Sequence, residues 1–435
     1  MCCLPEATDI FQTFDDVMAY LDGLGMFHQD LALDRISKTL DKLNASRLPC
    51  PVVQIIGTNG KGSTATFLHS IAMAHGFRSG LYTSPHFVSP AERIRMNNRQ
   101  LPPMAWPRLV SQVHQANSEL TYFEILTALA AISFRDTEPD VLFFEAGLGG
   151  RHDATTAVQA DLVCFTPIAL DHQNVLGATL SAIAEDKAAA IRQGVFAAVS
   201  AYQTPKALDC LLAKSRQAGI PLYGANKAKG ILQLSQAAQT LQDRVLSGVN
   251  LGLAGPHQLE NARTALTVWL LLCEKNAWHC SENSMRQGLE RAFIPGRLQM
   301  IAPNDSLPGI ILDGAHNPHS MAALKNALGS LHIKPGAVIF SCLADKNPPS
   351  LMPSLRDISG TAPIFTPTIR NNQRASNGND LAKIIGPNAL AVPDLPIALA
   401  ETTKLPLNGA PVLICGSLYL LAEFFSLYPQ ALDWH

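Results

Sequence analysis

The stretch Gly57-Thr-Asn-Gly-Lys-Gly-Ser-Thr64 decides the fold class of this chain. It follows an apolar segment at 51–56 and precedes an apolar, alanine-containing segment at 65–74, so it joins a predicted strand to a predicted helix. A glycine-rich turn at such a junction presents backbone N–H groups and a helix N-terminus to phosphate. Lys61 adds a positive charge, and the hydroxyls of Ser63 and Thr64 can face Mg²⁺ or phosphate oxygens. The stretch therefore predicts a site for a nucleoside triphosphate.

The loop departs from the standard phosphate-loop pattern, which has four residues between its glycines and Ser or Thr directly after Lys. Here two residues separate Gly57 from Gly60, and Gly62 stands between Lys61 and Ser63. The competing interpretation is a plain Gly/Asn turn between a strand and a helix. The rest of the chain must decide between the two interpretations, because a nucleotide site needs further polar residues and a plain turn does not.

Composition limits the classes of protein to consider. The chain has 435 residues, of which 47% are hydrophobic and 16% charged, so it can build more than one large core. Its net charge of −2 provides no basic surface for nucleic acid, and nucleic-acid binding is not expected. The longest apolar stretch, at 265–273, is too short to span a bilayer, so no membrane association is expected.

The cysteines and the N-terminal segment indicate the compartment. The nine cysteines follow no metal-binding spacing and no disulfide framework, which is typical of reduced thiols in a cytoplasm. The N-terminal segment contains Glu6 and Asp9 and no apolar core, so we expect no signal peptide. The sequence predicts a cytoplasmic protein.

The chain alternates predicted strands and helices, which favours an α/β fold with a mostly parallel sheet. We expect a phosphate-loop ATPase domain at 1–295 and a smaller, Rossmann-like α/β domain at 296–435, with a hinge at 293–296. Segments of weak patterning at 219–252 are interpreted as antiparallel additions to a sheet edge. The predicted strands are 51–56, 78–83, 140–145, 161–168, 309–313, 337–342, 364–366 and 412–415, and the predicted helices are 11–45, 65–74, 123–133, 181–192, 258–274, 321–331 and 380–385.

Polar residues follow several predicted strands of the first domain. Ser84 follows the second strand, Glu145 ends the third, and His172 follows the fourth. Ligands of open α/β sheets lie beyond the carboxyl ends of the strands, so these residues and the loop at 57–64 are expected to converge. A small number of protein ligands is enough for Mg²⁺, because the ion keeps several bound waters and also binds oxygens of the substrate phosphates. Taken singly, each residue has another interpretation: a turn at Ser84, an ion pair of Glu145 with Arg151, a helix cap at His172.

Lys187 is the least expected residue of the first domain. It falls on an apolar stripe with Ile183, Ala184, Ala188 and Ile191. One interpretation is a lysine that extends its ammonium group from the helix edge into water. The other is that Lys187 lines the cation site after reaction with CO₂, because a carbamate would turn a buried cation into a metal-binding anion.

The second domain has its own polar strand–helix junction at 313–318. Asp313 and His316 would project from this junction, where Gly314 allows a tight turn and Pro318 suits the first turn of a helix. Arg297 stands at the hinge, where it can reach a phosphate group. The competing interpretations are a helix cap for the junction and a solvated linker charge for Arg297.

Together these motifs resemble the folylpolyglutamate synthase and dihydrofolate synthase family of the Mur ligase superfamily, from about residue 14 to 425. The unusual phosphate loop is that family's own form. The other matching segments are TSPH at 83–86, AERIR at 91–95, LTYFE at 120–124, EAGLGGRHDAT at 145–155, LDH at 170–172, EDK at 185–187, HQ at 257–258, NA at 261–262, PGR at 295–297, DGAHNP at 313–318, DK at 345–346 and GSLY at 416–419. Departures include His152 and Thr156, where the family often has Leu and Asn, and Ala189, where it often has Gly.

The resemblance implies roles for individual residues. It implies catalytic roles for Lys61, Glu145, His172 and Lys187, with Mg²⁺ held by Ser84, Glu145, His172 and a carbamylated Lys187. Residues implied to hold ATP are Gly57, Thr58, Asn59, Gly60, Lys61, Gly62, Ser63, Thr64, Asn261, Arg297, Asp313 and His316. Residues implied to hold the pterin are Thr121, Phe123 and Asp153.

The resemblance also implies a reaction. ATP phosphorylates a pteroate or folate carboxylate, and the amine of L-glutamate attacks the acyl phosphate to give an amide, ADP and phosphate. The leading prediction is an enzyme that makes dihydrofolate from dihydropteroate and also extends the glutamate chain of reduced folates, acting as a monomer. The alternatives are a folylpolyglutamate synthase only, a cell-wall ligase of the Mur type, and a nucleotide-binding switch without ligase activity.

Overall fold

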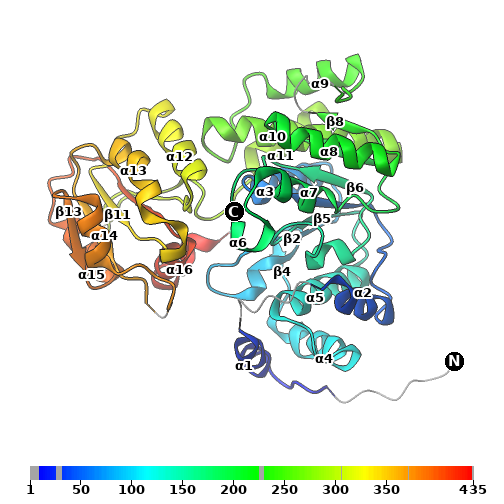
Figure 1. Cartoon of the computed structure of the whole chain (residues 1–435), viewed down its shortest axis with the longest axis horizontal. Helices are drawn as coiled ribbons and strands as arrows, with labels where there is room; N and C mark the ends of the chain where they lie inside the picture. The colour runs from blue at the N-terminus through cyan, green and yellow to red at the C-terminus, as the bar shows by residue number, and fades with distance from the viewer. Residues whose placement is uncertain (1–8, 26–31, 225–229, 305, 371, 434–435) are drawn as a thin grey trace. The chain divides into compact units, whose positions relative to one another are not determined.

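A computed structural model describes residues 9–25, 32–224, 230–304, 306–370 and 372–433 (Figure 1). The segment at 1–8, for which no signal peptide is expected, and part of the helical region predicted at 11–45 lie outside these ranges. The chain forms two compact units. Unit 1 comprises residues 1–249 and 261–289, and unit 2 comprises 250–260 and 290–435. Both units are α/β structures, as predicted.

Unit 1 contains an eight-stranded sheet in the order β4-β3-β2-β5-β1-β6-β7-β8. The six strands from β2 to β8 run parallel, and β3 and β4 extend one edge in antiparallel pairing. The strands are β1 (Val52–Ile56), β2 (Ser79–Tyr82), β3 (Ile94–Met96), β4 (Arg99–Gln100), β5 (Val141–Glu145), β6 (Leu162–Phe165), β7 (Ala197–Ser200) and β8 (Leu222–Gly224). Every residue of β1, β5 and β6 is buried, which agrees with the continuous apolar runs of central parallel strands.

The helices of unit 1 are α1 (Phe14–Leu24), α2 (Leu33–Lys42), α3 (Lys61–Ala74), α4 (Trp106–Ala116), α5 (Tyr122–Thr137), α6 (Gln173–Leu176), α7 (Leu180–Ala188), α8 (Pro205–Ala218), α9 (Gln236–Leu246), α10 (Pro256–Asn276) and α11 (Glu282–Arg291). The chain passes between the two units between α9 and α10, again within α10, and a third time near the end of α11. Helix α3 contacts β1, β2 and β5 and is buried along most of its length, because it packs over the middle of the sheet. Among the described residues no helix combines the length and apolar character needed to cross a bilayer.

One prediction for this unit is wrong. Residues 219–252 do not form antiparallel additions: β8 joins the sheet edge parallel to β7, and Gln236–Leu246 is helix α9. The antiparallel strands lie at the opposite edge, in β3 and β4. Helix α9 is polar and buries only Gln242 and Val245, so its apolar periodicity is weak. Its start is set by Ser235, whose hydroxyl accepts a hydrogen bond from the Ala238 N–H.

Unit 2 contains a six-stranded sheet in the order β13-β12-β11-β14-β10-β9, parallel except for the edge strand β9. Its strands are β9 (Gln299–Ile301), β10 (Ile310–Leu312), β11 (Ala337–Phe340), β12 (Ile364–Pro367), β13 (Ala389–Val392) and β14 (Val412–Cys415). Its helices are α12 (Pro318–Ser330), α13 (Met352–Ser359), α14 (Gly378–Ile385), α15 (Leu395–Thr403) and α16 (Leu418–Leu427), drawn from yellow to red in Figure 1. A separate apolar core that includes Ile311, Phe340 and Leu413 stabilises this unit.

Candidate nucleotide and metal site

The phosphate loop lies at the centre of the larger sheet. Strand β1 is flanked by β5 and β6, and it delivers the chain to Gly57, from which the loop leads into α3 at Lys61. The N-cap of α3 is Gly60, with φ of 85°, and no side chain caps the helix. The first N–H groups of a helix have no partner within it, so an uncapped N-terminus is an anion site. The Lys61 ammonium lies over the loop, 3.3 Å from the carbonyl oxygen of Gly57.

Two glycines of the loop are required by close contacts. A Cβ atom on Gly57 would lie 1.9 Å from the hydroxyl oxygen of Thr166. A Cβ on Gly60 would lie 2.5 Å from Oδ1 of Asn261, and the positive φ of Gly60 is one that residues with a side chain rarely adopt. Asn261 belongs to α10, so this helix lies directly against the loop. The plain-turn interpretation does not account for this packing of Asn261.

Glu145 and Ser84 meet at the same edge of the sheet. Glu145 is the last residue of β5 and is buried, and its Oε2 accepts a hydrogen bond of 3.1 Å from the Ser84 N–H. The same carboxylate oxygen would lie 3.4 Å from a Cβ on Gly62. The glycine that interrupts the standard pattern therefore lies beside a buried carboxylate. The alternative ion pair of Glu145 with Arg151 is not what forms, because Arg151 pairs with Asp186 at 4.0 Å.

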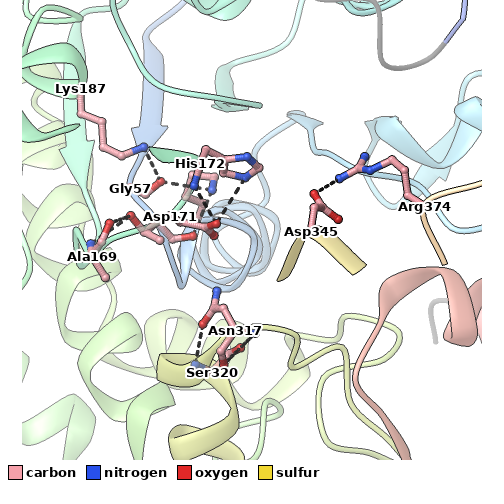
Figure 2. A network of polar contacts seen from close by, with 11 residues as sticks. Gly57, Ala169, Asp171, His172, Lys187, Asn317, Ser320, Asp345 and Arg374 are labelled. Carbon is pink, nitrogen blue, oxygen red and sulfur yellow. Dashed lines mark hydrogen bonds and ion pairs between the residues drawn. The ribbon is translucent and has the colours of Figure 1, made fainter. Parts of the chain in front are cut away.

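Lys187 lies beneath the loop rather than at the protein surface. Its side chain is 4% exposed, and its Nζ donates a hydrogen bond of 3.0 Å to the Gly57 carbonyl (Figure 2). Burial, followed by repulsion from the Lys61 ammonium, lowers the pKa of Lys187 from 10.5 to about 7. The interpretation that Lys187 extends its ammonium group into water is therefore excluded. A substantial fraction of this amine is uncharged near neutral pH, which is the form that reacts with CO₂.

The glycine loop after β5 sets the position of Lys187. A Cβ on Gly150 would lie 2.6 Å from the carbonyl oxygen of Lys187, so only glycine permits this approach to the backbone of α7. The Gly150 N–H donates a 2.9 Å hydrogen bond to Asp186. Gly149 has a φ of 75° and also approaches the Asp186 carboxylate. Asp186 thus fastens α7 to this loop and directs the neighbouring Lys187 toward the phosphate loop.

His172 is less enclosed than the other expected ligands. It stands at the N-cap of α6 with φ of 49°, and its side chain is 46% exposed and lies 3.9 Å from Asp171 (Figure 2). No group of three His, Cys, Asp or Glu side chains able to hold a metal occurs within the described ranges. The oxygens of Glu145 and Ser84 suit Mg²⁺, which needs only one or two carboxylates when substrate phosphates supply the rest. The donor set therefore fits Mg²⁺ bound together with a nucleotide.

Sequence reasoning missed the residues that hold the loop from behind. The N–H groups of Thr58 and Asn59 both donate to the Pro167 carbonyl, at 2.9 and 3.3 Å. The segment around Pro167 is in turn held by Gln203, whose Nε2 donates to the Thr166 carbonyl and whose Oε1 accepts from the Ile168 N–H, both at 3.0 Å. Gln203 is 6% exposed. A glutamine after a short apolar run carries no signal of such a role, because the contact depends on the neighbouring strands β6 and β7.

The three expected pterin residues also have structural contacts. Asp153 is buried and accepts hydrogen bonds from the N–H groups of Leu148 and Thr155, at 2.7 and 3.0 Å. Burial raises the pKa of Asp153, and these hydrogen bonds oppose the rise. Thr121 caps α5 and donates through its hydroxyl to Glu124 at 2.8 Å. Phe123 is half-buried, with its ring against Gly147, so it is the one of the three with an aromatic face at a loop of the site.

The strand–helix junction of unit 2 uses its polar groups internally. The Asp313 carboxylate accepts hydrogen bonds of 2.9 Å from the N–H groups of Leu298 and Ala315. Burial raises the pKa of Asp313, and the nearby Arg297 guanidinium opposes the rise. Nδ1 of His316 lies 2.8 Å from the Gly314 carbonyl oxygen. Unit 2 thus brings Arg297, Asp313 and His316 to one junction, while Asn261 lies at the loop of unit 1.

Comparison with known proteins agrees with this geometry. Residues 55–269 match the Mur ligase middle domain, and residues 296–418 match the Mur ligase glutamate ligase domain. An Escherichia coli protein named dihydrofolate synthase/folylpolyglutamate synthase is 32% identical over 93% of this chain and 93% of its own length. The chain belongs to the dihydrofolate synthase/folylpolyglutamate synthase family. A Bacillus subtilis protein of the same name is 29% identical over 95% of this chain and 99% of its own length.

Solved structures of the family share the fold. The E. coli enzyme FolC in complex with DHPP and ADP matches with a TM-score of 0.82 and 28% identity, over 96% of this chain and 98% of that one. A bifunctional folylpolyglutamate synthase/dihydrofolate synthase with Mn, AMPPNP and L-glutamate bound matches with a TM-score of 0.80, 28% identity and the same coverage. The predicted two-part Mur ligase architecture is confirmed. Family members are ATP-dependent ligases, so the interpretation of this chain as a nucleotide-binding switch without ligase activity loses its support.

Proposed function

We propose that this chain is an ATP-dependent amide ligase that adds L-glutamate to dihydropteroate, giving dihydrofolate, and to reduced folates. The substrate carboxylate attacks the γ-phosphorus of ATP, forming an acyl phosphate and releasing ADP. The amine of L-glutamate then attacks the acyl carbon, and phosphate leaves as the amide forms. The observation that carries the proposal is the buried Lys187 amine under the phosphate loop, with the Glu145 carboxylate against the same loop.

The residues of unit 1 suit the phosphoryl-transfer step. We propose that the N-terminus of α3 and the amides from Gly57 to Thr64 hold the phosphates, with Lys61 neutralising their charge. Phosphoryl transfer depends on positioning and charge neutralisation, and a loop that is hydrogen-bonded to Pro167 and packed against Asn261 supplies a fixed position. Asn261 is proposed to contact the nucleotide beside Gly60.

The proposed Mg²⁺ ligands are Ser84, Glu145, His172 and the carbamate of Lys187. When bound, the ion would offset negative charge on the phosphates. Carbamate formation joins the Lys187 nitrogen to the carbon of CO₂ and releases one proton, which requires the uncharged amine. The lowered pKa of Lys187 supports this reaction, since burial favours the uncharged form.

We propose that unit 2 supplies the glutamate-ligase residues, with the functional boundary at 295/296. Arg297, Asp313 and His316 are proposed to complete the ATP site, and the match of 296–418 to the glutamate ligase domain supports this assignment. We also propose that the chain acts as a cytoplasmic monomer without nucleic-acid or membrane partners. Light scattering of the purified protein with and without Mg-ATP tests the monomer.

Dual specificity is the finer part of the proposal, and Thr121, Phe123 and Asp153 are its proposed pterin residues. The test is ADP release with Mg-ATP and L-glutamate, with dihydropteroate in one reaction and tetrahydrofolate in another. Turnover with both supports the two activities. Turnover with tetrahydrofolate alone would make the chain a folylpolyglutamate synthase only, and would remove the pterin role of Asp153. No turnover with either, while ADP still binds, would overturn the ligase.

A further inference from the structure

Two cysteines of unit 1 lie in direct contact, away from the nucleotide site. Cys273 is in the last turn of α10 and is buried, and Cys280 is half-buried and stands two residues before α11. Their sulfur atoms are 2.7 Å apart, although both are free thiols. A disulfide bond is about 2.05 Å long, so a small side-chain movement brings the two sulfurs to bonding distance.

The segment between the cysteines is held by aromatic packing, so the contact is built into the fold. Trp278 lies in this segment, and its ring centroid is 4.8 Å from that of Phe77 and 5.7 Å from that of Trp269. The next N–H after Cys280, that of Ser281, donates a 3.1 Å hydrogen bond to Nε2 of His75. These contacts hold the middle and the C-terminal end of the short connection, independently of the two thiols.

We propose that Cys273 and Cys280 form a reversible dithiol–disulfide site, oxidised by a low-molecular-weight disulfide. The thiolate of Cys280 attacks one sulfur of the reagent, which gives a mixed disulfide and releases one thiol. The sulfur of Cys273 then attacks Cys280, releases the second thiol and closes the internal bond. The two protein thiols lose two electrons and two protons, and the reagent disulfide is reduced to two thiols.

The order of the two attacks follows from the surroundings of each sulfur. Cys280 is the more exposed of the pair, and its hydrogen bond with the Cys273 thiol lowers the pKa of Cys280. The hydrogen bond to Cys280 and burial raise the pKa of Cys273. The accessible sulfur is therefore the one that ionises first, and the thiolate is the attacking species. The buried sulfur resolves the mixed disulfide.

The bond would tie together the helices that hold α3. Helix α11 packs tightly on α3, since a Cβ on Gly288 would lie 2.5 Å from the Cα of Ile71. A link from α10 to the start of α11 closes this hairpin and restrains the unfolded chain. The phosphate loop is at the opposite end of α3, about 20 Å away at 1.5 Å per residue. Oxidation is therefore expected to slow thermal unfolding of unit 1 without changing the site that binds nucleotide.

A metal site is the competing use of two adjacent thiols. A structural zinc ion needs four ligands. No cluster of three such ligands exists in the described part of the chain, although His75 and His279 are near one another. The pair is thus better suited to a disulfide than to a metal ion.

The test treats the purified full-length protein with oxidised glutathione, blocks remaining thiols by alkylation, and maps the peptides by mass spectrometry. The expected product is an internal link between Cys273 and Cys280, which dithiothreitol reverses, and a rise in the unfolding temperature of about 2–4 °C. Cys280→Ser should lose both the link and the rise. Cys210→Ser is the matched control, since Cys210 is also half-buried, and it should keep both.

The proposal is overturned if Cys210 or Cys50 is modified by glutathione while Cys273 and Cys280 remain alkylated as free thiols. It is also overturned if the oxidised pair stops at a mixed disulfide with glutathione on Cys280. Cys273→Ser provides a second variant: it should trap that mixed disulfide on Cys280, because the resolving sulfur is missing. ADP binding measured on the same samples should be unchanged, which separates this inference from the proposed ligase activity.

Discussion

The two units contain the same local arrangement, a strand followed by a glycine turn and a helix, yet they treat the helix N-terminus in opposite ways. In unit 1, Gly60 precedes α3 and no side chain caps it. In unit 2, Asn317 precedes α12 and forms a capping box with Ser320, whose N–H donates to Asn317 at 2.8 Å. A capped helix has its first N–H groups satisfied by its own side chains, and an uncapped one keeps them for an anion.

The charged side chains around the two junctions also differ. The α3 junction has Lys61 and Lys187 near its loop, with the Glu145 carboxylate beside them. The α12 junction has the buried Asp313 carboxylate beside Arg297, and this carboxylate accepts hydrogen bonds from the N–H groups of Leu298 and Ala315. The comparison teaches that a strand–glycine–helix topology does not by itself make a phosphate site. The absence of a side-chain cap leaves the first N–H groups of α3 available to an anion, whereas those of α12 are used by Asn317 and Ser320.

The largest effect is expected at Lys187, the buried amine that distinguishes the first junction. Lys187→Ala should lower ADP release with all folate substrates by about 10²–10³-fold, the usual loss when a charged group of a reaction site is removed. The far-UV spectrum and the cooperative unfolding transition should persist. Lys206→Ala, on exposed α8, is the control. Full activity of the Lys187→Ala variant would show that Lys187 takes no part in the reaction.

The second effect concerns the uncapped glycine. Gly60→Ala should weaken ADP binding by roughly 10–100-fold, because the new Cβ meets Asn261 and the positive φ strains the loop. Gly76→Ala is the matched control, since its φ is 84° and nothing lies within 4 Å of its Cβ. Calorimetric titration with ADP measures both variants. Equal ADP affinities of the two variants would contradict a specific role of Gly60 in the phosphate loop.

A smaller effect is expected where the loop is supported from behind. Gln203→Leu removes the hydrogen bonds to Thr166 and Ile168 and should raise KM for ATP roughly fivefold, with a smaller change in kcat. KM for L-glutamate should stay constant, because Gln203 acts only through the segment that fastens the phosphate loop. A parallel fall in kcat for all substrates, with KM for ATP unchanged, would contradict a positioning role.

The pH dependence of stability gives a further test of Lys187. Its pKa is lowered from 10.5 to about 7 in the folded chain, so between these values the unfolded chain binds more protons. Stability should therefore rise with pH from about 7 toward 10, by at most about 1.4 kcal/mol per pH unit, and be flat below pH 7. Urea unfolding of wild type and Lys187→Met at several pH values isolates this contribution. A difference between the two proteins that does not vary with pH would contradict the lowered pKa.

The smallest effect is expected at the capped junction. Asn317→Ala should lower the free energy of unfolding by about 1 kcal/mol through loss of the N-cap. ADP affinity in the same variant should change little if phosphate binding belongs to the α3 junction alone. Urea unfolding and ADP titration give the two numbers. A large loss of ADP affinity would show that the α12 junction takes part in binding phosphate. The contrast between the two helix N-termini would then be wrong.

Much of the fold follows from local patterns in the sequence. The central strands β1, β5 and β14 are continuous apolar runs, and they were predicted within about one residue because burial on both faces leaves no polar alternation. Helix α9 and strands β3 and β4 are among the elements that were missed, together with α4, α8 and β7. Helix α9 and strand β4 are mostly exposed and carry little hydrophobic periodicity, and β3 is mostly buried but only three residues long. The convergence of Glu145 and Ser84 was predicted because parallel strands end at one edge.

The sequence by itself determined the class of site: a glycine loop between a buried strand and a helix, with Lys61 and hydroxyls in it, is sufficient for a nucleotide hypothesis because these properties are local. Only the tertiary structure decided that Lys187 is buried under Gly57, that Gln203 supports the loop, and that Cys273 touches Cys280. Residues 130 positions apart, such as Gly57 and Lys187, are brought together by strand order and helix packing. Burial and neighbouring charge, which set the state of that amine, exist only in the folded chain.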